Sequence, residues 1–172
     1  MVSDQQRRSC SVEVLVFDTT TPTPPPTIPT PTYYVNATID DNALTFNNNI
    51  TDSTAKSTST INGETTYTTT LTITGINTST MYASYVIVLT NQLNAIATGT
   101  YTNTDAANIA NCTYTDGSGN EYVTGTSQPF TVTVTSVTSS AISGTFSGTL
   151  ISPADATKTI TVTNGSFNVP SQ

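Results

Sequence analysis

The side chains that could do acid–base chemistry in this chain are few, and they are almost all carboxylates. The 172 residues include 11 Asp or Glu, four Lys or Arg and no His. Because there is no imidazole, the 41 Thr and 18 Ser hydroxyls lack the usual base of a nucleophile–base–orienter triad. A glycosidase would need two carboxylates in one cleft, and most of these acids fall in predicted turns or near the N-terminus. We therefore expect a protein that is not an enzyme and uses no cofactor.

One acidic loop has the spacing of a cation site. Asp116, Ser118 and Asn120 place oxygen atoms at alternate positions, as calcium-binding loops do. Such loops have Gly at position six and Glu at position twelve, where this sequence has Glu121 and Ser127. The same stretch is typical of a five-residue hairpin turn whose Asp and Gly residues accept positive φ. The turn is the favoured interpretation, so we expect no metal site, and these three residues are the candidates if one exists.

Two further features could bind a ligand but also have a structural explanation. Asp40 and Asp41 could chelate a cation, yet with Asn42 they stand where a tight turn is required. Aromatic rows on a β-sheet can stack on sugars or contact proteins, but the chain has no Trp, which sugar-binding platforms usually include. Rings that cap the ends of a β-sheet core are the commoner arrangement. The tyrosines concerned are Tyr33, Tyr34, Tyr67, Tyr82, Tyr85, Tyr101, Tyr114 and Tyr122.

The surface expected from the composition is polar but nearly uncharged. Charged residues make up 9% of the chain, and the net charge is −7. Four basic residues are too few to replace the counterions of a nucleic acid, so we expect no nucleic-acid partner. No apolar run is long enough to span a bilayer, so we expect no transmembrane segment. A surface of Thr, Ser and Asn is typical of secreted β-proteins, which predicts an extracellular or cell-envelope location, with no export signal visible in the chain.

The elements that must position these residues are strands. Thr, Val, Ile and Tyr suit a pleated surface, and no window has apolar residues at helical spacing for three turns. Turn signals recur every 8–12 residues or so, which is typical of an antiparallel sandwich or barrel. We expect an all-β fold, an antiparallel β-sandwich of Ig-like or jelly-roll type, over residues 33–172. The predicted strands are 33–39, 43–46, 65–74, 81–89, 99–102, 111–115, 121–124, 130–137, 141–150, 157–163 and 166–169.

Four details of this pattern make specific predictions. Residues 47–60 contain few apolar side chains and are predicted to be a loop or weak edge. The Tyr-Val-Ile-Val-Leu run within residues 81–89 predicts a central strand buried on both faces. Asn164-Gly165 predicts the turn of a closing hairpin. Gly144 and Gly148 lie on an inward face and predict a bulge or a close contact with another strand.

An N-terminal arm precedes the predicted domain. Residues 1–18 contain one alternating apolar strand, and residues 19–32 hold six of the nine prolines. These prolines predict an extended linker that, at about 3.1 Å per residue, spans roughly 40 Å. The arm strand could add to the sheet edge of a neighbouring copy, or fold back as an edge strand of its own domain. Its candidate interaction residues are Val12, Val14, Val16 and Phe17.

The two cysteines allow more than one interpretation. A disulfide between Cys10 and Cys112 would tie the N-terminal strand to the middle of the domain. Alternatively, Cys112 is a small buried apolar residue that has no relation to Cys10. The sequence leaves both open.

Three segments contain sequence motifs that are recognisable from a known family. They are Tyr33-Tyr-Val-Asn-Ala-Thr-Ile-Asp40, Ile142-Ser-Gly-Thr-Phe-Ser-Gly-Thr-Leu150 and Thr159-Ile-Thr-Val-Thr-Asn-Gly-Ser-Phe-Asn-Val169. Residues 33–170, which include all three, resemble a family of small envelope lipoproteins of Bacteroidetes, in which a Pro/Thr-rich tether follows a lipid-bearing cysteine. The resemblance implies a β-sandwich held at the cell envelope by lipid, with no established activity. Cys10 would be the acylated residue, although Arg7-Arg8-Ser9 is not the usual lipobox.

Two functions fit these observations. The first is a non-enzymatic module of the cell envelope or extracellular space, with a structural, adhesion or ligand-binding role toward a protein or glycan at the cell surface. The second is a subunit of an extracellular assembly, such as a filament or a virion surface. In that case residues 12–17 would join neighbouring copies by strand addition.

Overall fold

The structure, a computed structural model, describes residues 32–61, 64–77, 79, 83–92 and 94–171. The chain from Pro31 onward forms one compact unit. Cys10, the arm strand with Val12, Val14, Val16 and Phe17, and nearly all of the Pro/Thr-rich linker lie outside the described residues. The predictions made for the arm and the linker therefore stay predictions.

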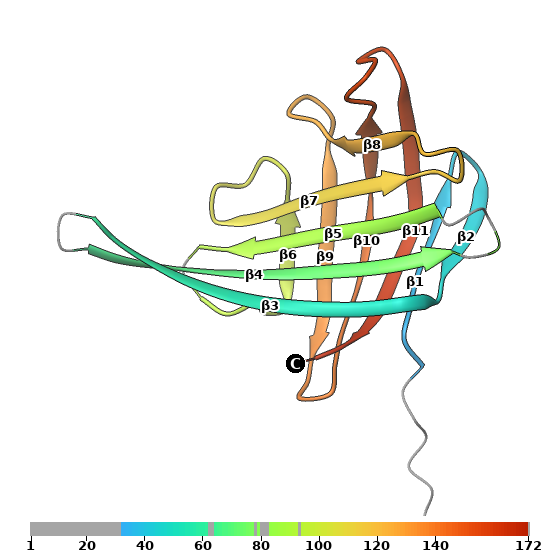
Figure 1. The fold of residues 1–172 in the computed structure, drawn as a ribbon. Coiled ribbons are helices and arrows are strands. Elements are labelled where there is room, and N and C mark those ends of the chain that lie inside the picture. Colours follow the sequence, from blue (N-terminus) through green and yellow to red (C-terminus); the bar gives the residue numbers. More distant parts are fainter. Residues whose placement is uncertain (1–31, 62–63, 78, 80–82, 93, 172) are drawn as a thin grey trace, which may run out of the picture. The chain divides into compact units, whose positions relative to one another are not determined.

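The described residues form an all-β fold, as the sequence predicts. Strands account for 66% of the structure and helices for 0%. The pairings are antiparallel except for one, in which Thr102 of β6 lies parallel to Ile109 of β7. The strands of Figure 1 are β1 (Tyr34–Ile39), β2 (Asn42–Phe46), β3 (Asn48–Ile61), β4 (Glu64–Asn77), β5 (Ala83–Asn91), β6 (Gly99–Thr102), β7 (Asn108–Thr115), β8 (Glu121–Thr124), β9 (Phe130–Val137), β10 (Ala141–Ile151) and β11 (Thr159–Pro170).

The strands join into one hydrogen-bonded sheet that closes on itself in part. Its order is β2-β1-β11-β10-β9-β6-β7-β5-β4-β3, and the short strand β8 pairs with both β7 and β10. That double pairing links β6, β7, β8, β10 and β9 into a closed five-stranded barrel. The predicted sandwich is not confirmed, because β8 joins two parts of the sheet that a sandwich would leave as separate edges.

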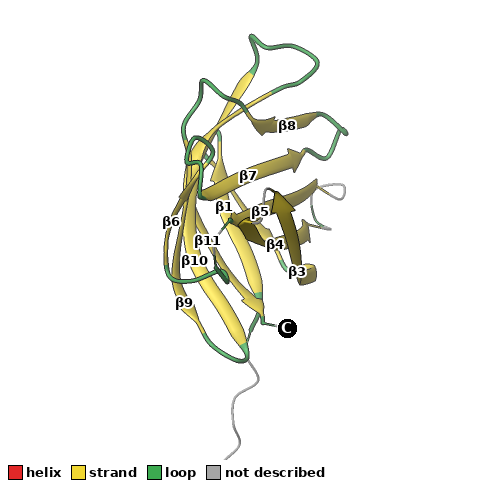
Figure 2. Ribbon diagram, turned by 90° about the vertical axis from the view of Figure 1, so that its left-hand side faces the viewer, coloured by secondary structure: helices red, strands yellow, loops and turns green. Residues whose placement is uncertain are grey.

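The core lies between two groups of strands that cross. Strands β3, β4, β5 and β7 run across β1, β11, β10, β9 and β6 (Figures 1 and 2). Tyr85 of β5 and Phe146 of β10 meet in the middle, with ring centroids 5.1 Å apart. The largest fully buried side chains are Tyr85, Phe46, Phe130, Phe167, Ile73, Ile87, Leu89, Leu150, Val35, Val132 and Val134. Each contributes on the order of 1.5–3 kcal/mol by leaving water.

Alternation explains most strands, and one prediction built on it is wrong. The pattern of β1 buries Val35, Ala37 and Ile39 on one face, as expected from a half-buried strand. Strand β5 was predicted to be buried on both faces, but only Ala83, Tyr85, Ile87 and Leu89 are buried, and the residues between them are half-buried. The valines of the outer face are present because β-branched side chains suit a strand, whether or not that face is covered.

Residues 47–60, predicted to be a loop or weak edge, form most of the long edge strand β3, which lies at the end of the strand order and pairs with β4 alone among the described strands. It pairs with β4 from Asn48 opposite Ile76 to Ile61 opposite Glu64, with one irregularity between Asn48 and Thr51. The edge alternative is therefore confirmed and the loop alternative is wrong, because the ladder is made by backbone groups and does not need apolar alternation. Thr-rich segments accept strand geometry without burying a face.

The predicted hairpin turn at Asn164-Gly165 is a β-bulge within the continuous strand β11. On the β10 side Phe146 pairs with Gly165 and Gly148 with Val162, so Ser147 alone faces two residues of β11. Asn164 has a φ of 51°, a value that Asn tolerates better than most residues. The same conformational freedom serves a hairpin turn or a bulge, which is why the sequence signal was misassigned.

The glycines predicted to mark close contacts do so. A Cβ on Gly144 would lie 2.5 Å from Cζ of Phe167, and a Cβ on Gly148 would lie 2.6 Å from Cα of Phe130. Gly148 also has a φ of 153° and borders the register shift in β10. Both halves of the prediction, a bulge and a close approach, are therefore confirmed.

Candidate functional site

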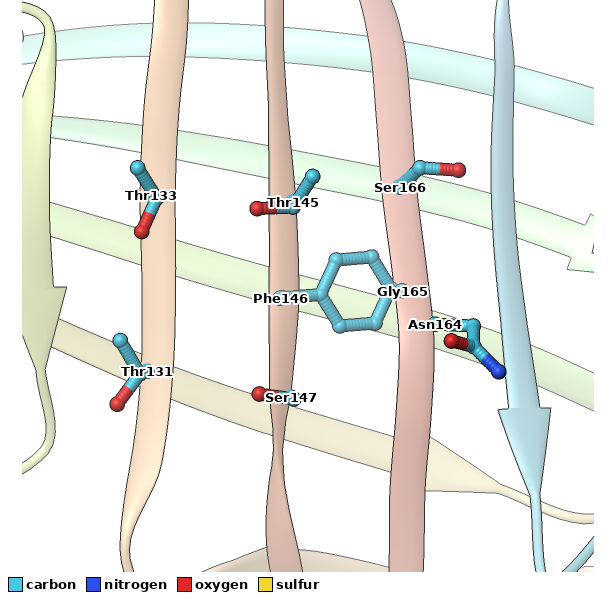
Figure 3. Close-up of a pocket in the computed structure, with 8 residues that line it drawn as sticks. All are labelled: Thr131, Thr133, Thr145, Phe146, Ser147, Asn164, Gly165 and Ser166. Atoms are coloured by element: carbon cyan, nitrogen blue, oxygen red, sulfur yellow. The ribbon is translucent and has the colours of Figure 1, made fainter.

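Two hollows on the domain surface could hold a ligand, and the first lies on the outer face of β9, β10 and β11. Its volume is about 420 Å³. Figure 3 shows that hydroxyl side chains of three neighbouring strands line it, with the Phe146 ring and Gly165 between them. We call this surface the hydroxyl face, and its polar residues are Thr131, Thr133, Thr145, Ser147, Asn164 and Ser166.

Strand register sets the spacing of the hydroxyl face. Thr133 of β9 lies opposite Thr145 of β10, which in turn lies opposite Ser166 of β11. A second, shorter row pairs Thr131 with Ser147. Because neighbouring strands are about 4.8 Å apart, the residues within a row repeat at about that interval. None of the lining residues carries a charge, so the surface can donate and accept hydrogen bonds but cannot attract an ion strongly.

The second hollow lies between the β1–β2 hairpin and the β7–β8 hairpin. Its volume is about 380 Å³, and it combines carboxylate, aromatic and aliphatic walls. We call it the tyrosine hollow, and its residues are Ile39, Asp40, Asn42, Leu44, Tyr114, Asp116, Tyr122 and Ile160. The two hairpins thus bring together acids that are far apart in the sequence.

Asp40 is fixed by the turn in which the sequence analysis placed it. Ile39 pairs with Asn42, so Asp40 and Asp41 are the two loop residues, with φ of 45° and 65°. Positive φ at both positions is the signature of the tight hairpin turn that suits strand twist. One carboxylate oxygen of Asp40, Oδ1, accepts a hydrogen bond from the backbone N–H of Thr161 at 2.7 Å. The side chain therefore extends the β1–β11 ladder by one acceptor.

Asp116 organises the loop that was considered as a cation site. Its Oδ1 accepts the backbone N–H groups of Ser118 and Asn120 at 2.8 and 2.9 Å, and its Oδ2 accepts the Asn120 side-chain amide at 2.8 Å. Burial tends to raise the pKa of Asp116, but these hydrogen bonds outweigh it and the pKa lies below its usual value. Both carboxylate oxygens are thus used within the turn, which supports the turn interpretation of Asp116, Ser118 and Asn120.

Tyr114 and Tyr122 form the aromatic wall of the tyrosine hollow. They lie opposite each other on β7 and β8, with ring centroids 6.3 Å apart and ring planes inclined by 27°. Burial raises the pKa of Tyr114, and the nearby Asp116, Tyr122 and Asp40 raise it further. The hydroxyl of Tyr114 therefore lies in the electrostatic field of both carboxylates.

The remaining tyrosines differ in burial, and Tyr85 lies in the middle of the core and not at its end. Tyr85 and Tyr101 are buried, and Tyr33 and Tyr34 are half-buried. Nothing is described for the side chains of Tyr67 and Tyr82. What sequence reasoning missed is the pairing of Tyr114 and Tyr122 beside Asp40, and no local signal could have revealed it, because the contact depends on two separate hairpins.

A third, smaller hollow of about 230 Å³ lies between the β6–β7 and β8–β9 loops. Asn103 occupies its centre and bridges the two loops. The side-chain amide donates to the backbone carbonyls of Gly125 and Gln128, each at 2.7 Å, while Oδ1 accepts the N–H of Phe130 at 2.9 Å. All of its hydrogen-bonding capacity is directed at the backbone, so this asparagine is a structural element of the fold.

Cys112 lies in the core and forms no disulfide with another described residue. Burial raises its pKa strongly and also raises the pKa of the neighbouring Tyr85 hydroxyl. A thiol held in its protonated form is a poor nucleophile. Cys10 lies outside the described residues, so a disulfide between the two cysteines stays one of the two alternatives that the sequence leaves open.

No group of three or more Cys, Asp or Glu side chains is placed to hold a metal ion in the described part of the chain. No described helix is long and apolar enough to cross a membrane. No family model, curated protein or solved structure matches this chain.

Proposed function

We propose that this chain is a non-enzymatic binding module of the cell surface or extracellular space, and that its hydroxyl face binds a neutral glycan. The observation that carries the proposal is the register-aligned row of Thr133, Thr145 and Ser166 across three strands. A row of hydroxyls complements a ligand that is itself a row of hydroxyls. The uncharged lining favours a neutral sugar over an acidic one.

The affinity of one such site for a short glycan is expected to be low. A net hydrogen bond contributes about 0.5–1.5 kcal/mol, and the hydroxyl face offers no exposed aromatic ring for stacking. Four or five such bonds, less the entropy lost on binding, correspond to a Kd on the order of 1 mM. Useful adhesion then requires several copies displayed together on one surface, which suits the tethered, envelope-held arrangement implied by the family resemblance.

The test is a titration of the 15N-labelled chain with neutral oligosaccharides, followed by NMR. We expect shifts confined to β9, β10 and β11, and the double variant Thr133→Val, Thr145→Val should weaken binding by about two- to tenfold for each lost hydrogen bond. Thr159→Val, an exposed threonine of β11 outside the hydroxyl face, is the matched control. Chemical-shift changes outside these three strands would contradict the proposal. So would an equal loss of affinity in the double variant and in Thr159→Val.

The alternative proposal is a subunit of an extracellular assembly joined through residues 12–17. What supports it is the open edge of β2, which among the described strands pairs only with β1. An edge of this kind presents unpaired backbone groups that an added strand could bond. Light scattering of the full chain and of a Val14→Asp, Val16→Asp variant tests it. An assembly that the variant dissolves would support it, and a monomeric full-length chain would exclude it.

A further inference from the structure

The tyrosine hollow differs from the hydroxyl face in charge and in shape, and it points to a different ligand. We propose that the tyrosine hollow binds a guanidinium group, that of an exposed arginine on a partner protein. The inference stands apart from the glycan proposal, because it concerns other residues on another part of the surface. It would make the domain a module with a protein contact as well as a sugar contact.

The tyrosine hollow carries negative charge that no basic side chain in its lining compensates. Asp40 and Asp116 face the hollow from two different hairpins, and no lining residue is basic. The ion pair found among the described residues lies outside the hollow. It joins Lys158 and Asp155, which are 4.0 Å apart and both exposed. The whole chain carries a net charge of −7, so the wider field also attracts a cation.

The carboxylate oxygens of Asp40 and Asp116 differ in the hydrogen bonds that they already accept within the protein. Both oxygens of Asp116 accept hydrogen bonds within its own loop, whereas the recorded bond to Asp40 falls on Oδ1 alone. Asp40 Oδ2 is therefore the oxygen that can receive a donor from a ligand, and Asp116 contributes charge. One such oxygen is too little for a divalent ion, which needs six or more ligands in the case of calcium. It is enough for an N–H donor.

The walls of the tyrosine hollow are aromatic and aliphatic. A guanidinium is planar and weakly hydrated, and it stacks on aromatic faces better than an ammonium does. The half-buried Tyr122, which lies beside the buried Tyr114 with the two ring planes inclined by 27°, supplies such a face. Leu44 and Ile160 form an aliphatic wall along which the methylene stem of an arginine can lie. The volume of about 380 Å³ is within the range of small-ligand pockets and exceeds what a guanidinium alone requires.

The variants that test the charge are chosen to preserve the turn. Asp40→Asn removes the charge but keeps the Oδ1 acceptor for Thr161 and tolerates the φ of 45°. Asp41→Asn is the matched control, since Asp41 has a φ of 65°, is exposed and does not line the hollow. Tyr122→Leu removes the aromatic face while keeping an apolar side chain on β8. If Asp40→Asn does not fold, Asp116→Asn replaces it, because an amide oxygen can still accept the loop N–H groups.

The experiment is an NMR titration of the full chain with the capped peptide acetyl-Gly-Arg-Gly-amide. Its controls are the same peptide with citrulline, which is neutral and nearly isosteric, or with lysine. We expect the Arg peptide to shift the signals of Tyr122 and of the Asp40 turn with a Kd on the order of 10 mM. The Lys peptide should bind more weakly and the citrulline peptide at least about fivefold more weakly. Asp40→Asn and Tyr122→Leu should each weaken Arg binding by about fivefold, and Asp41→Asn by less than about twofold.

Several outcomes would overturn the inference. Equal binding of the Arg and citrulline peptides would show that charge is not recognised. Equal loss in Asp40→Asn and Asp41→Asn would show a general surface field instead of a site. A calcium titration that shifts the same signals at lower concentration than the Arg peptide would make the hollow a metal site, and no shift with the Arg peptide would exclude a guanidinium site altogether.

Discussion

The ring of Phe146 on β10 covers Gly165, the residue directly opposite it on β11. A Cβ on Gly165 would lie 2.5 Å from Cδ2 of Phe146. The relationship is repeated two residues along the ladder, where Phe167 of β11 covers Gly144 of β10, and the two rings are 6.4 Å apart. The sequences Gly144-Thr-Phe146 and Gly165-Ser-Phe167 thus interlock, each aromatic ring filling the space that the opposite glycine leaves.

This arrangement predicts that Gly165→Ala is destabilising. The added methyl would meet the Phe146 ring and its carbonyl, and overpacking of this kind lowers the free energy of unfolding by about 1–3 kcal/mol. Urea unfolding of the variant measures the loss. Ser166→Ala, the next residue along β11, should change the unfolding free energy by less than about 0.5 kcal/mol. Equal stability of the two variants would show that the ring yields to the methyl.

Asn103 is predicted to hold the β8–β9 loop to β6. Replacing it with Ala leaves two carbonyls and the Phe130 N–H without their partner, and the free energy of unfolding should fall by about 2–3 kcal/mol. Asn103→Asp should also destabilise, because it loses both amide donors. Asn94→Ala, an exposed asparagine in another loop, is the control for thermal unfolding. A melting temperature unchanged in Asn103→Ala would mean that water replaces the bridge.

The thiol of Cys112 is predicted to be unreactive in the native state. It is buried in the core, and its pKa lies well above the usual range, so neither access nor thiolate is available at pH 8. In a Cys10→Ser background, a disulfide reagent should label the native chain at least about a hundredfold more slowly than the urea-unfolded chain. Fast labelling without denaturant would show that the β5–β7 region opens readily.

The same thiol predicts a loss of stability in alkali. The unfolded thiol ionises above a pKa of about 8.5, whereas burial keeps the native Cys112 thiol protonated to higher pH. Stability is therefore full below pH 8.5 or so and falls as pH rises, by about 1.4 kcal/mol per unit until the native pKa is reached. Urea unfolding between pH 8 and 10 should show a loss of about 2 kcal/mol in the Cys10→Ser chain. The double variant Cys10→Ser, Cys112→Ala should not show this loss. If the unfolding free energies of the two chains depend on pH in the same way, the loss does not come from Cys112.

The sequence predicted those parts of the fold that depend on near neighbours. Strand β9 has the bounds expected from its alternation, and the Asp40-Asp41 turn follows from residues that accept positive φ. For β3 the sequence left a loop and a weak edge strand open, because its ladder is made by backbone groups, which leave no periodic trace in side-chain hydrophobicity. Asn164-Gly165 was assigned to the wrong structure because one backbone conformation serves both a turn and a bulge.

The candidate site was predicted only in fragments. Asp40 and Asp116 were each recognised as turn residues, but their approach requires the β1–β2 and β7–β8 hairpins to line one hollow. The hydroxyl face was visible only as a high content of Thr, since the row of Thr133, Thr145 and Ser166 exists through strand register. Register is set by long-range pairing, and a single sequence carries little information about it.

The pairing of β1 with β11 has a consequence for how the protein is made. Tyr34 lies opposite Asn168, so the first strand of the domain takes its inner neighbour from the last one. A ribosome adds residues at about 5–20 per second, and a nascent chain that stops short of Thr159 leaves β1 and β10 each without that partner. The sheet can therefore be completed only once β11 has been synthesised, and until then β1 and β10 each expose an edge that other chains could pair with.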